Sequence, residues 1–230
     1  MRSENRPPIV LLHGWGGSFD STWVANGWLD AIRAAGRTVI PIDLPGHGPS
    51  GGSNDPGDYG MLVDAVGRKI PEDVVVDAIG FSLGAKLVLA LAARDMKQYR
   101  RIVVAGLGGN AFAPEKLASV LADALEAGLS ESTPPAVRRL VDYALGAGNH
   151  AGSVAAVLRR VPNPVITPTR LMWLRLPTLV IAGDQDGIAM PLDPLLEAMP
   201  HARSVVIPGV DHLGLPSCKA FRDAALAFVD

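Results

Sequence analysis

The 230-residue sequence contains a single cysteine, Cys218, and few aromatic (5%) or charged (19%) residues. One thiol excludes an intramolecular disulfide framework and a four-cysteine zinc site. The net charge of −2 argues against a charged disordered tail and against a nucleic-acid binder that acts through bulk positive charge. A globular domain remains, since a hydrophobic share of 48% is enough for a sizeable core.

Long hydrophobic runs are also missing. The first apolar run stops at His13 after four residues, whereas a secretory signal needs about 7–15 apolar residues and a membrane span about 18. We therefore expect a cytoplasmic protein without a membrane span, either a monomer or a homodimer.

Metal and cofactor signatures are weak. His150 and His201 have no cysteine or acidic cluster at metal-ligand spacing, and no Walker loop follows an apolar run. We expect neither a metal nor a nucleotide cofactor. Cys218 is expected to lie in the C-terminal helix, away from any base, and to be inert.

Six short runs rich in β-branched residues each end in a turn signal, and helix-length segments separate most of them. Two such segments, 23–36 and 83–99, have helical spacing, and the second is apolar nearly all round. Apolar strands that alternate with helices indicate a parallel sheet covered on both faces. The six runs are 9–14, 37–46, 74–80, 101–106, 178–183 and 204–209.

About 70 residues separate the fourth run from the fifth, too many for a simple crossover. They contain three segments with helical spacing, at 114–128, 134–146 and 150–161, followed by several prolines. The sequence therefore predicts an α/β core of residues 1–106 and 177–230, with a helical lid at 107–176 inserted after the fourth strand.

The third run leads directly into Gly80-Phe81-Ser82-Leu83-Gly84, which is G-x-S-x-G between a strand and a helix. In a nucleophile elbow the serine occupies a sharp, strained turn, and the flanking glycines avoid clashes with neighbouring backbone. Ser82 is therefore the candidate nucleophile.

A serine hydroxyl needs a base, and the base needs an orienting acid. The fifth run is followed by Asp184 and Asp186, and the sixth by His212. Parallel strands deliver their carboxyl ends to one edge of the sheet, so these side chains should emerge beside Ser82. From the residues alone, either aspartate could be the acid.

These pieces closely resemble the α/β-hydrolase superfamily over essentially the whole chain. The resemblance implies that Asp186, three residues after Gly183, is the acid. It also implies that backbone N–H groups of Trp15 and Leu83 form the oxyanion hole. Because only eight residues precede Ile9, we expect six parallel strands and no antiparallel leading strand. The matching motifs are HGWGG (13–17), DLPGHGPS (43–50), GFSLG (80–84), GDQDGIAMP (183–191) and VDHLG (210–214).

The main prediction is a cofactor-independent serine hydrolase that cleaves a carboxylic ester or thioester through an acyl-enzyme at Ser82. The motifs are most similar to the branch of pimeloyl-carrier-protein methyl ester esterases. One alternative is a lyase like the menaquinone-pathway synthase, which has a basic residue four positions after its serine, where Lys86 stands here. The commoner explanation, and the one we expect, is that the Lys86 side chain reaches solvent from its helix. Another alternative is a ligand receptor or regulatory partner that keeps the triad with little turnover.

Two further sets of residues have competing interpretations. His13 and His47 are expected to be packed, hydrogen-bonded residues, and Trp23, Trp28 and Trp173 either pack or line an acyl pocket. Residues 132–176 contain one acidic residue, Asp142, and six arginines, so this segment is either ordinary solvated charge or a surface that attracts a carrier such as coenzyme A or an acyl carrier protein. The arginines are Arg138, Arg139, Arg159, Arg160, Arg170 and Arg175.

Overall fold

The computed structural model describes residues 6–49, 51–113, 117–162 and 164–230. In these ranges a six-stranded, all-parallel sheet has the order β2-β1-β3-β4-β5-β6. Every strand overlaps its expected run, and no antiparallel strand precedes β1 in the described chain. The strands are β1 (Ile9–Leu12), β2 (Val39–Ile42), β3 (Val76–Phe81), β4 (Tyr99–Ala105), β5 (Thr178–Gly183) and β6 (Arg203–Ile207).

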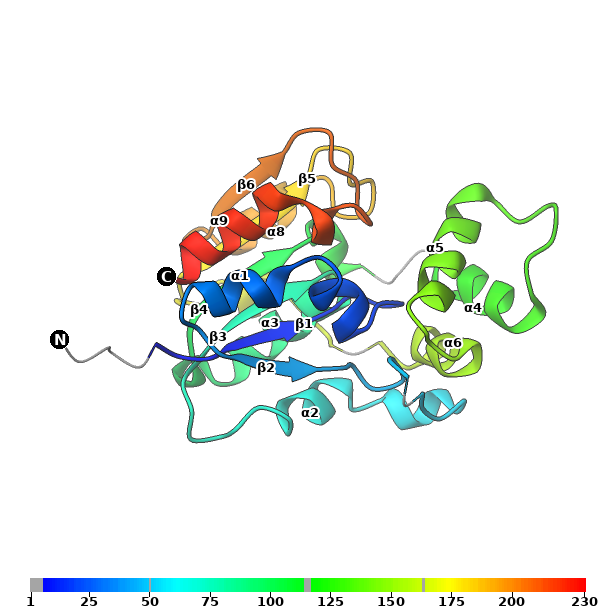
Figure 1. Cartoon of the computed structure of the whole chain (residues 1–230), viewed down its shortest axis with the longest axis horizontal. Coiled ribbons are helices and arrows are strands. Elements are labelled where there is room, and N and C mark those ends of the chain that lie inside the picture. The colour runs from blue at the N-terminus through cyan, green and yellow to red at the C-terminus, as the bar shows by residue number, and fades with distance from the viewer. Residues whose placement is uncertain (1–5, 50, 114–116, 163) are drawn as a thin grey trace.

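The two faces of the sheet carry separate apolar cores because successive side chains of a strand point to opposite sides. Val10 and Leu12 of β1 belong to one core, and Ile9 and Leu11 to the other. Helices α1 (Trp28–Ala34) and α9 (Lys219–Val229) cover the face of Ile9 (Figure 1). The opposite face is covered by α2 (Leu62–Gly67), α3 (Leu83–Arg94), α7 (Pro168–Leu171) and α8 (Asp193–Ala198).

Two expected helices are shorter than the sequence pattern suggested. In the segment 23–36, Gly27 has a φ of 72° and separates a π-helical turn, Asp20–Val24, from α1. The segment 83–99 ends as α3 at Arg94 and passes through a 3₁₀ turn before β4. Hydrophobic periodicity predicts where a helix lies and does not mark the residue at which it breaks. The 3₁₀ turns are Pro56–Tyr59, Met96–Gln98, Gly109–Phe112 and Leu215–Ser217.

The long segment after β4 is helical, as expected. It forms α4 (Ala118–Ala127), α5 (Pro135–Gly146) and α6 (Ala151–Arg159), which pack around a small core that includes Leu121 and Val141. Residues 114–116 of the first expected helix lie outside the described residues, as do Ser50 and Asn163. In Figure 1 these three helices lie together beyond the arrowheads of β1 and β2, at the carboxyl edge of the sheet. We call α4–α6 the helical insertion; the lid boundaries at 107 and 176 stay a prediction.

No helix in the described parts of the chain combines the length and the apolar character that crossing a membrane requires.

Candidate active site

Ser82 occupies the tight turn between β3 and α3. Its φ of 54° and ψ of −114° make it the only non-glycine residue with a positive φ among the described residues. Such a backbone costs of order 1–3 kcal/mol and persists only where the surroundings hold it in place. Here the Ser82 N–H donates to the Ala105 carbonyl of β4 at 2.8 Å. The sheet therefore holds the strained turn.

The glycines on either side of Ser82 are required by contact with neighbouring backbone. A Cβ at Gly80 would lie 2.5 Å from the Gly84 carbonyl oxygen, and one at Gly84 would lie 2.2 Å from the Leu12 carbonyl oxygen. Real Cβ atoms do not approach backbone so closely. This confirms the steric reason for glycine at both positions of the motif.

A continuous chain of hydrogen bonds joins Ser82, His212 and Asp186. The Ser82 Oγ lies 3.0 Å from His212 Nε2, and His212 Nδ1 lies 2.8 Å from Asp186 Oδ2 and 3.0 Å from Asp186 Oδ1. A carboxylate at Nδ1 selects the tautomer with the proton on Nδ1, which leaves Nε2 free to accept the serine proton.

The Asp186 carboxylate is itself oriented by backbone. It is fully buried, and its Oδ1 accepts the N–H groups of Ile188 at 3.0 Å and Ala189 at 2.9 Å. Asp184, the other candidate acid, is exposed, and its Oδ1 accepts the Gly209 N–H at 2.7 Å. The structure therefore places Asp186 on His212, and Asp184 holds the turn after β6.

The His212 loop is fixed from two sides. The Phe81 ring packs against the imidazole with centroids 4.9 Å apart. The preceding residue, Asp211, accepts the Gly214 N–H at 2.8 Å and pairs at 2.6 Å with Arg139 of α5. The Arg139 guanidinium, and then the Gly214 N–H, lower the pKa of Asp211. The helical insertion thus contacts the residue next to the candidate base.

Both expected oxyanion donors occupy suitable backbone positions. Leu83 begins α3, and the first N–H groups of a helix have no partner within it. The Gly14 carbonyl accepts the Gly17 N–H at 3.1 Å and the His13 Nδ1–H at 2.8 Å. In a trans peptide the N–H points away from the carbonyl, so these bonds set the direction of the Trp15 N–H. Their oxyanion role stays a prediction.

His13 and His47 are packed residues, as expected. His13 is fully buried, and its Nε2 accepts the Leu44 N–H at 3.0 Å. His47 lies edge-on to it, with ring centroids 5.3 Å apart, and its Nδ1–H donates to Pro45 at 3.1 Å. Burial, and then the nearby His13, lower the pKa of His47 to about 3. A proton on Nε2 of His47 would have no acceptor among the described residues.

A cavity of about 480 Å³ opens onto Ser82 and His212. Its walls are mostly apolar and come from both the core and the helical insertion. Lys86 also lines it and is only 7% exposed, so the expectation that its ammonium reaches solvent is wrong. The physical reason is that α3 is buried from Leu83 through Ala92. The apolar lining includes Phe81, Leu117, Leu121, Leu140, Leu158, Ile188, Met190, Pro191 and Leu213.

The expected tryptophans do not line this cavity. Trp23 and Trp28 are fully buried as an edge-to-face pair, 4.9 Å apart, in the core beneath α9. Trp173 is 67% exposed, so the packing interpretation is wrong for it. The side chain that sequence reasoning missed is Trp15, which lines the cavity and whose indole N–H donates to the Val154 carbonyl of α6 at 3.0 Å.

Asn149 is a second residue that the sequence did not single out. It is buried just before α6, and its amide donates to the carbonyls of Gly16 at 2.7 Å, Gly17 at 3.3 Å and Ala144 at 2.9 Å. Its Oδ1 accepts the Gly48 N–H at 2.7 Å. One side chain therefore joins the loop that carries Trp15, the turn after β2 and the helical insertion.

Most arginines of residues 132–176 have local partners. Arg159 binds Asp123 at 2.6 Å and Glu126 at 2.9 Å on α4, and Glu126, followed by Asp123, raises its pKa. Arg160 is buried and donates to the Val157 carbonyl. The acidic partners of Arg159 lie on α4, so a charge count over 132–176 omits them, and the attraction of a carrier to this segment stays a prediction.

Among the described residues, no group of three or more histidine, cysteine or acidic side chains could hold a metal ion. Cys218 lies at the N-terminus of α9 and is partly buried.

Comparison with known sequences finds a matching family model and relatives that match part of the chain. The model of the Alpha/beta hydrolase family matches residues 9–224. A pimeloyl-acyl-carrier-protein methyl ester esterase of Aromatoleum aromaticum is 38% identical over 104 residues, which cover 44% of this chain and 38% of the relative. The acetyltransferase component of an acetoin cleaving system from Pseudomonas putida is 34% identical over 110 residues, covering 46% of this chain and 29% of the relative. The matches thus span less than half the length of these curated relatives.

Solved structures share the fold over nearly the whole chain. NosK from Streptomyces actuosus has a TM-score of 0.74 at 22% identity, with 97% of each chain covered. An esterase from Exiguobacterium antarcticum has a TM-score of 0.74 at 17% identity, with 97% of this chain and 91% of that chain covered. At these identities the likeness establishes the fold alone.

Proposed function

Because this chain belongs to the alpha/beta hydrolase family, we propose that it is a cofactor-independent serine hydrolase that cleaves a carboxylic ester or thioester. The observation that carries the proposal is the hydrogen-bonded chain from Ser82 through His212 to Asp186 at the mouth of an apolar cavity.

In the first half-reaction the Ser82 Oγ attacks the acyl carbon while His212 Nε2 takes its proton. Asp186 stabilises the imidazolium that forms, and the Leu83 and Trp15 N–H groups stabilise the tetrahedral oxyanion. The imidazolium then protonates the leaving alkoxide or thiolate, and an acyl ester remains on Ser82. In the second half-reaction His212 takes a proton from water, whose oxygen attacks that ester, and the carboxylic acid leaves as the proton returns to Ser82.

The cavity favours an apolar acyl group. A volume of about 480 Å³ lies within the range of small-molecule sites, and leucines from the insertion line the cavity together with Phe81 and Leu213 of the core. We propose that the acyl chain lies between these two walls. The acyl group could be carried on coenzyme A or on an acyl carrier protein. The names of the esterase relatives include an acyl carrier protein, and the bond that those relatives cleave is a methyl ester.

The position of Lys86 supports a second candidate function, that of a lyase. Lys86 lies one helical turn after Ser82 and lines the same cavity, where an ammonium could hold an anionic substrate. A lyase would release its product by elimination, without an acyl ester on Ser82.

A fluorophosphonate probe tests the nucleophile directly. We expect one molecule of probe per chain, mapped by peptide mass spectrometry to Ser82, and no labelling of Ser82→Ala. The exposed Ser204→Ala variant is the matched control and should label normally. Labelling that persists in Ser82→Ala would overturn the assignment.

A further inference from the structure

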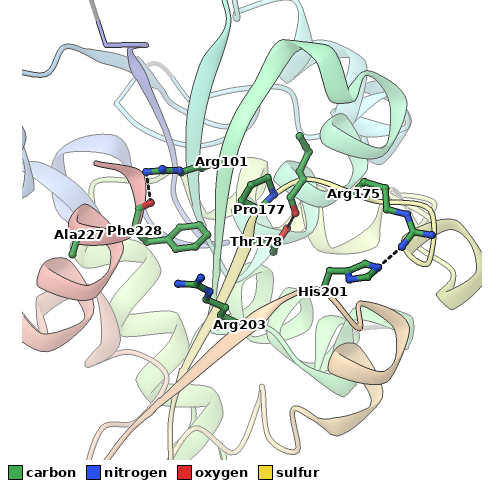
Figure 2. Close-up of a pocket in the computed structure, with 9 residues that line it drawn as sticks. Arg101, Arg175, Pro177, Thr178, His201, Arg203, Ala227 and Phe228 are labelled. Carbon is green, nitrogen blue, oxygen red and sulfur yellow. Dashed lines mark hydrogen bonds between the residues drawn. The ribbon is translucent and has the colours of Figure 1, made fainter. Parts of the chain in front are cut away.

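A second cavity, of about 680 Å³, lies at the edge of the sheet opposite Ser82. Arg101 of β4, Thr178 at the start of β5 and Arg203 at the start of β6 line it, together with the end of α9. In Figure 2, Arg101, Arg203 and Phe228 lie on one side of Pro177 and Thr178. Arg175 and His201 lie on the other side.

The charge of this cavity is of one sign. Three arginines and His201 line it, and none of the described lining residues is acidic. Arg101 donates one N–H to the Phe228 carbonyl at 2.9 Å, which leaves most of its guanidinium donors available. The guanidinium of Arg203 makes no hydrogen bond or ion pair with another described residue.

The contact between Arg175 and His201 also indicates that the cavity is rich in basic groups. Arg175 Nη1 lies against His201 Nε2, and since a guanidinium can only donate, the imidazole nitrogen is the acceptor in this contact. Two basic side chains thus meet, and no carboxylate of the described residues pairs with either of them. This differs from Arg139 and Arg159, which each have acidic partners.

The remaining wall of the cavity is apolar, formed by Leu176, Pro177, Ala227 and Phe228. Guanidinium groups bind phosphate in a bidentate manner, and an aromatic or aliphatic body would lie against the apolar wall. The volume is that of a site for a small organic molecule rather than for a bare ion.

We propose that the cavity between Arg101, Arg175 and Arg203 is a binding site for an organic phosphate with an apolar or aromatic body. Thr178 and Gly183 are the first and last of the six residues of β5, and Gly183 lies just before the Asp186 turn. Five steps of about 3.3 Å per residue place them roughly 17 Å apart. The ligand therefore takes no part in the reaction at Ser82. Binding joins β4, β5, β6 and α9, so it stabilises the folded chain by mass action.

Isothermal titration calorimetry at low salt tests the site with adenosine 5′-diphosphate as the probe, beside inorganic phosphate and adenosine. We expect saturable, one-to-one binding of the diphosphate, at least about tenfold weaker binding of inorganic phosphate, and none of adenosine. Arg175→Ala and Arg203→Ala should each weaken diphosphate binding about tenfold or more, a loss in line with charge-assisted bonds. Arg203→Lys, which keeps the charge and loses the planar fork, should fall between.

Arg33→Ala is the matched control, because Arg33 is an exposed arginine on α1 that does not line the cavity, and its affinity should be unchanged. Fluorophosphonate labelling of Ser82 reports separately on the catalytic site and checks that each variant is folded. No saturable binding up to about 10 mM diphosphate overturns the proposal. So does binding that survives the double change of Arg175 and Arg203 to Ala, or tighter binding of a polyglutamate peptide than of the diphosphate.

Discussion

In the sheet core, Ser82, Asp186 and His212 each follow a strand within a few residues, and the parallel sheet alone brings them together. In the helical insertion, Asn149 and Arg139 reach the site only because α5 and α6 dock on the loops beside it. The core therefore supplies the chemistry and the insertion supplies the contacts that hold it. Changes in the core should mainly reduce turnover, and changes in the insertion should reduce turnover and stability together.

The largest effect is expected at the acid of the core. Asp186→Asn should lower kcat by up to about 10⁴-fold, because the wrong histidine tautomer is then favoured. Asp184→Asn is the matched control, since its side chain contacts Gly209 and not His212, and it should change kcat by less than about threefold. Steady-state kinetics with an aryl ester measures both. If Asp184→Asn were the crippling change, the assignment of the two carboxylates would be reversed.

A smaller effect, on both stability and kcat, is expected when Asn149 is replaced. Asn149→Ala leaves backbone groups of Gly16 and Gly48 without their partner, which should cost about 1–3 kcal/mol of unfolding free energy. It should also lower kcat about 10–100-fold, because the loop that carries the Trp15 N–H loses its support and a full oxyanion donor is worth about 10²–10³. Urea unfolding and kinetics measure the two effects.

Asn26→Ala is the matched control for that experiment. Asn26 also donates to two carbonyls, of Ser21 at 3.2 Å and Thr22 at 3.0 Å, but away from the site. It should lower stability and leave kcat unchanged. Equal kcat for Asn149→Ala and wild type would show that the insertion does not support the oxyanion loop.

The buried His47, which packs against His13, should make the stability of the fold depend on pH. Burial lowers the pKa of His47 to about 3, and in the unfolded chain it is near 6.5. Between these values the unfolded state binds one more proton, so stability should fall with decreasing pH by up to about 1.4 kcal/mol per pH unit. His47→Asn, whose amide can replace the bond to Pro45, should remove this part of the slope, and the exposed His150→Gln should not. An unchanged slope in His47→Asn would contradict the assignment.

The smallest effect is expected at the exposed pair of Arg139 and Asp211. Arg139 lowers the pKa of Asp211, so the pair stabilises the fold above the ordinary range of an aspartate, near 3.9, and this contribution is lost as pH falls through the lower folded value. Both side chains are more than a third exposed, so Arg139→Ala should cost less than about 1 kcal/mol at neutral pH and less in high salt. Arg138 donates to the Ser130 carbonyl and has no acidic partner among the described residues. Arg138→Ala should therefore lower the free energy of unfolding by no measurable amount. A loss of several kcal/mol would show that the pair is a main support of the insertion.

The same comparison explains what the sequence could predict. Ser82, Asp186 and His212 could be found because a local motif, the order of the strands and a family resemblance all point to them. That the side chains of Trp15 and Lys86 line the cavity, and that Asn149 joins two loops, depends on how the insertion and the core meet. Hydrophobic periodicity contains no signal for that docking. The acidic partners of Arg159 could not be predicted for the same reason, since they lie on α4, outside the counted segment.

Stopped-flow kinetics with a 4-nitrophenyl ester and intact-mass analysis of the quenched protein together test whether turnover passes through an acyl ester on Ser82. We expect a burst of one equivalent of nitrophenol per chain, together with a mass increase of one acyl group on Ser82. Nitrophenol should then be released at a steady rate. Ser82→Ala should show neither the mass increase nor more than about 10⁻³ of the turnover. Steady product release by the wild-type protein with no acylated Ser82 at any time, or acylation that is never released, would contradict this mechanism.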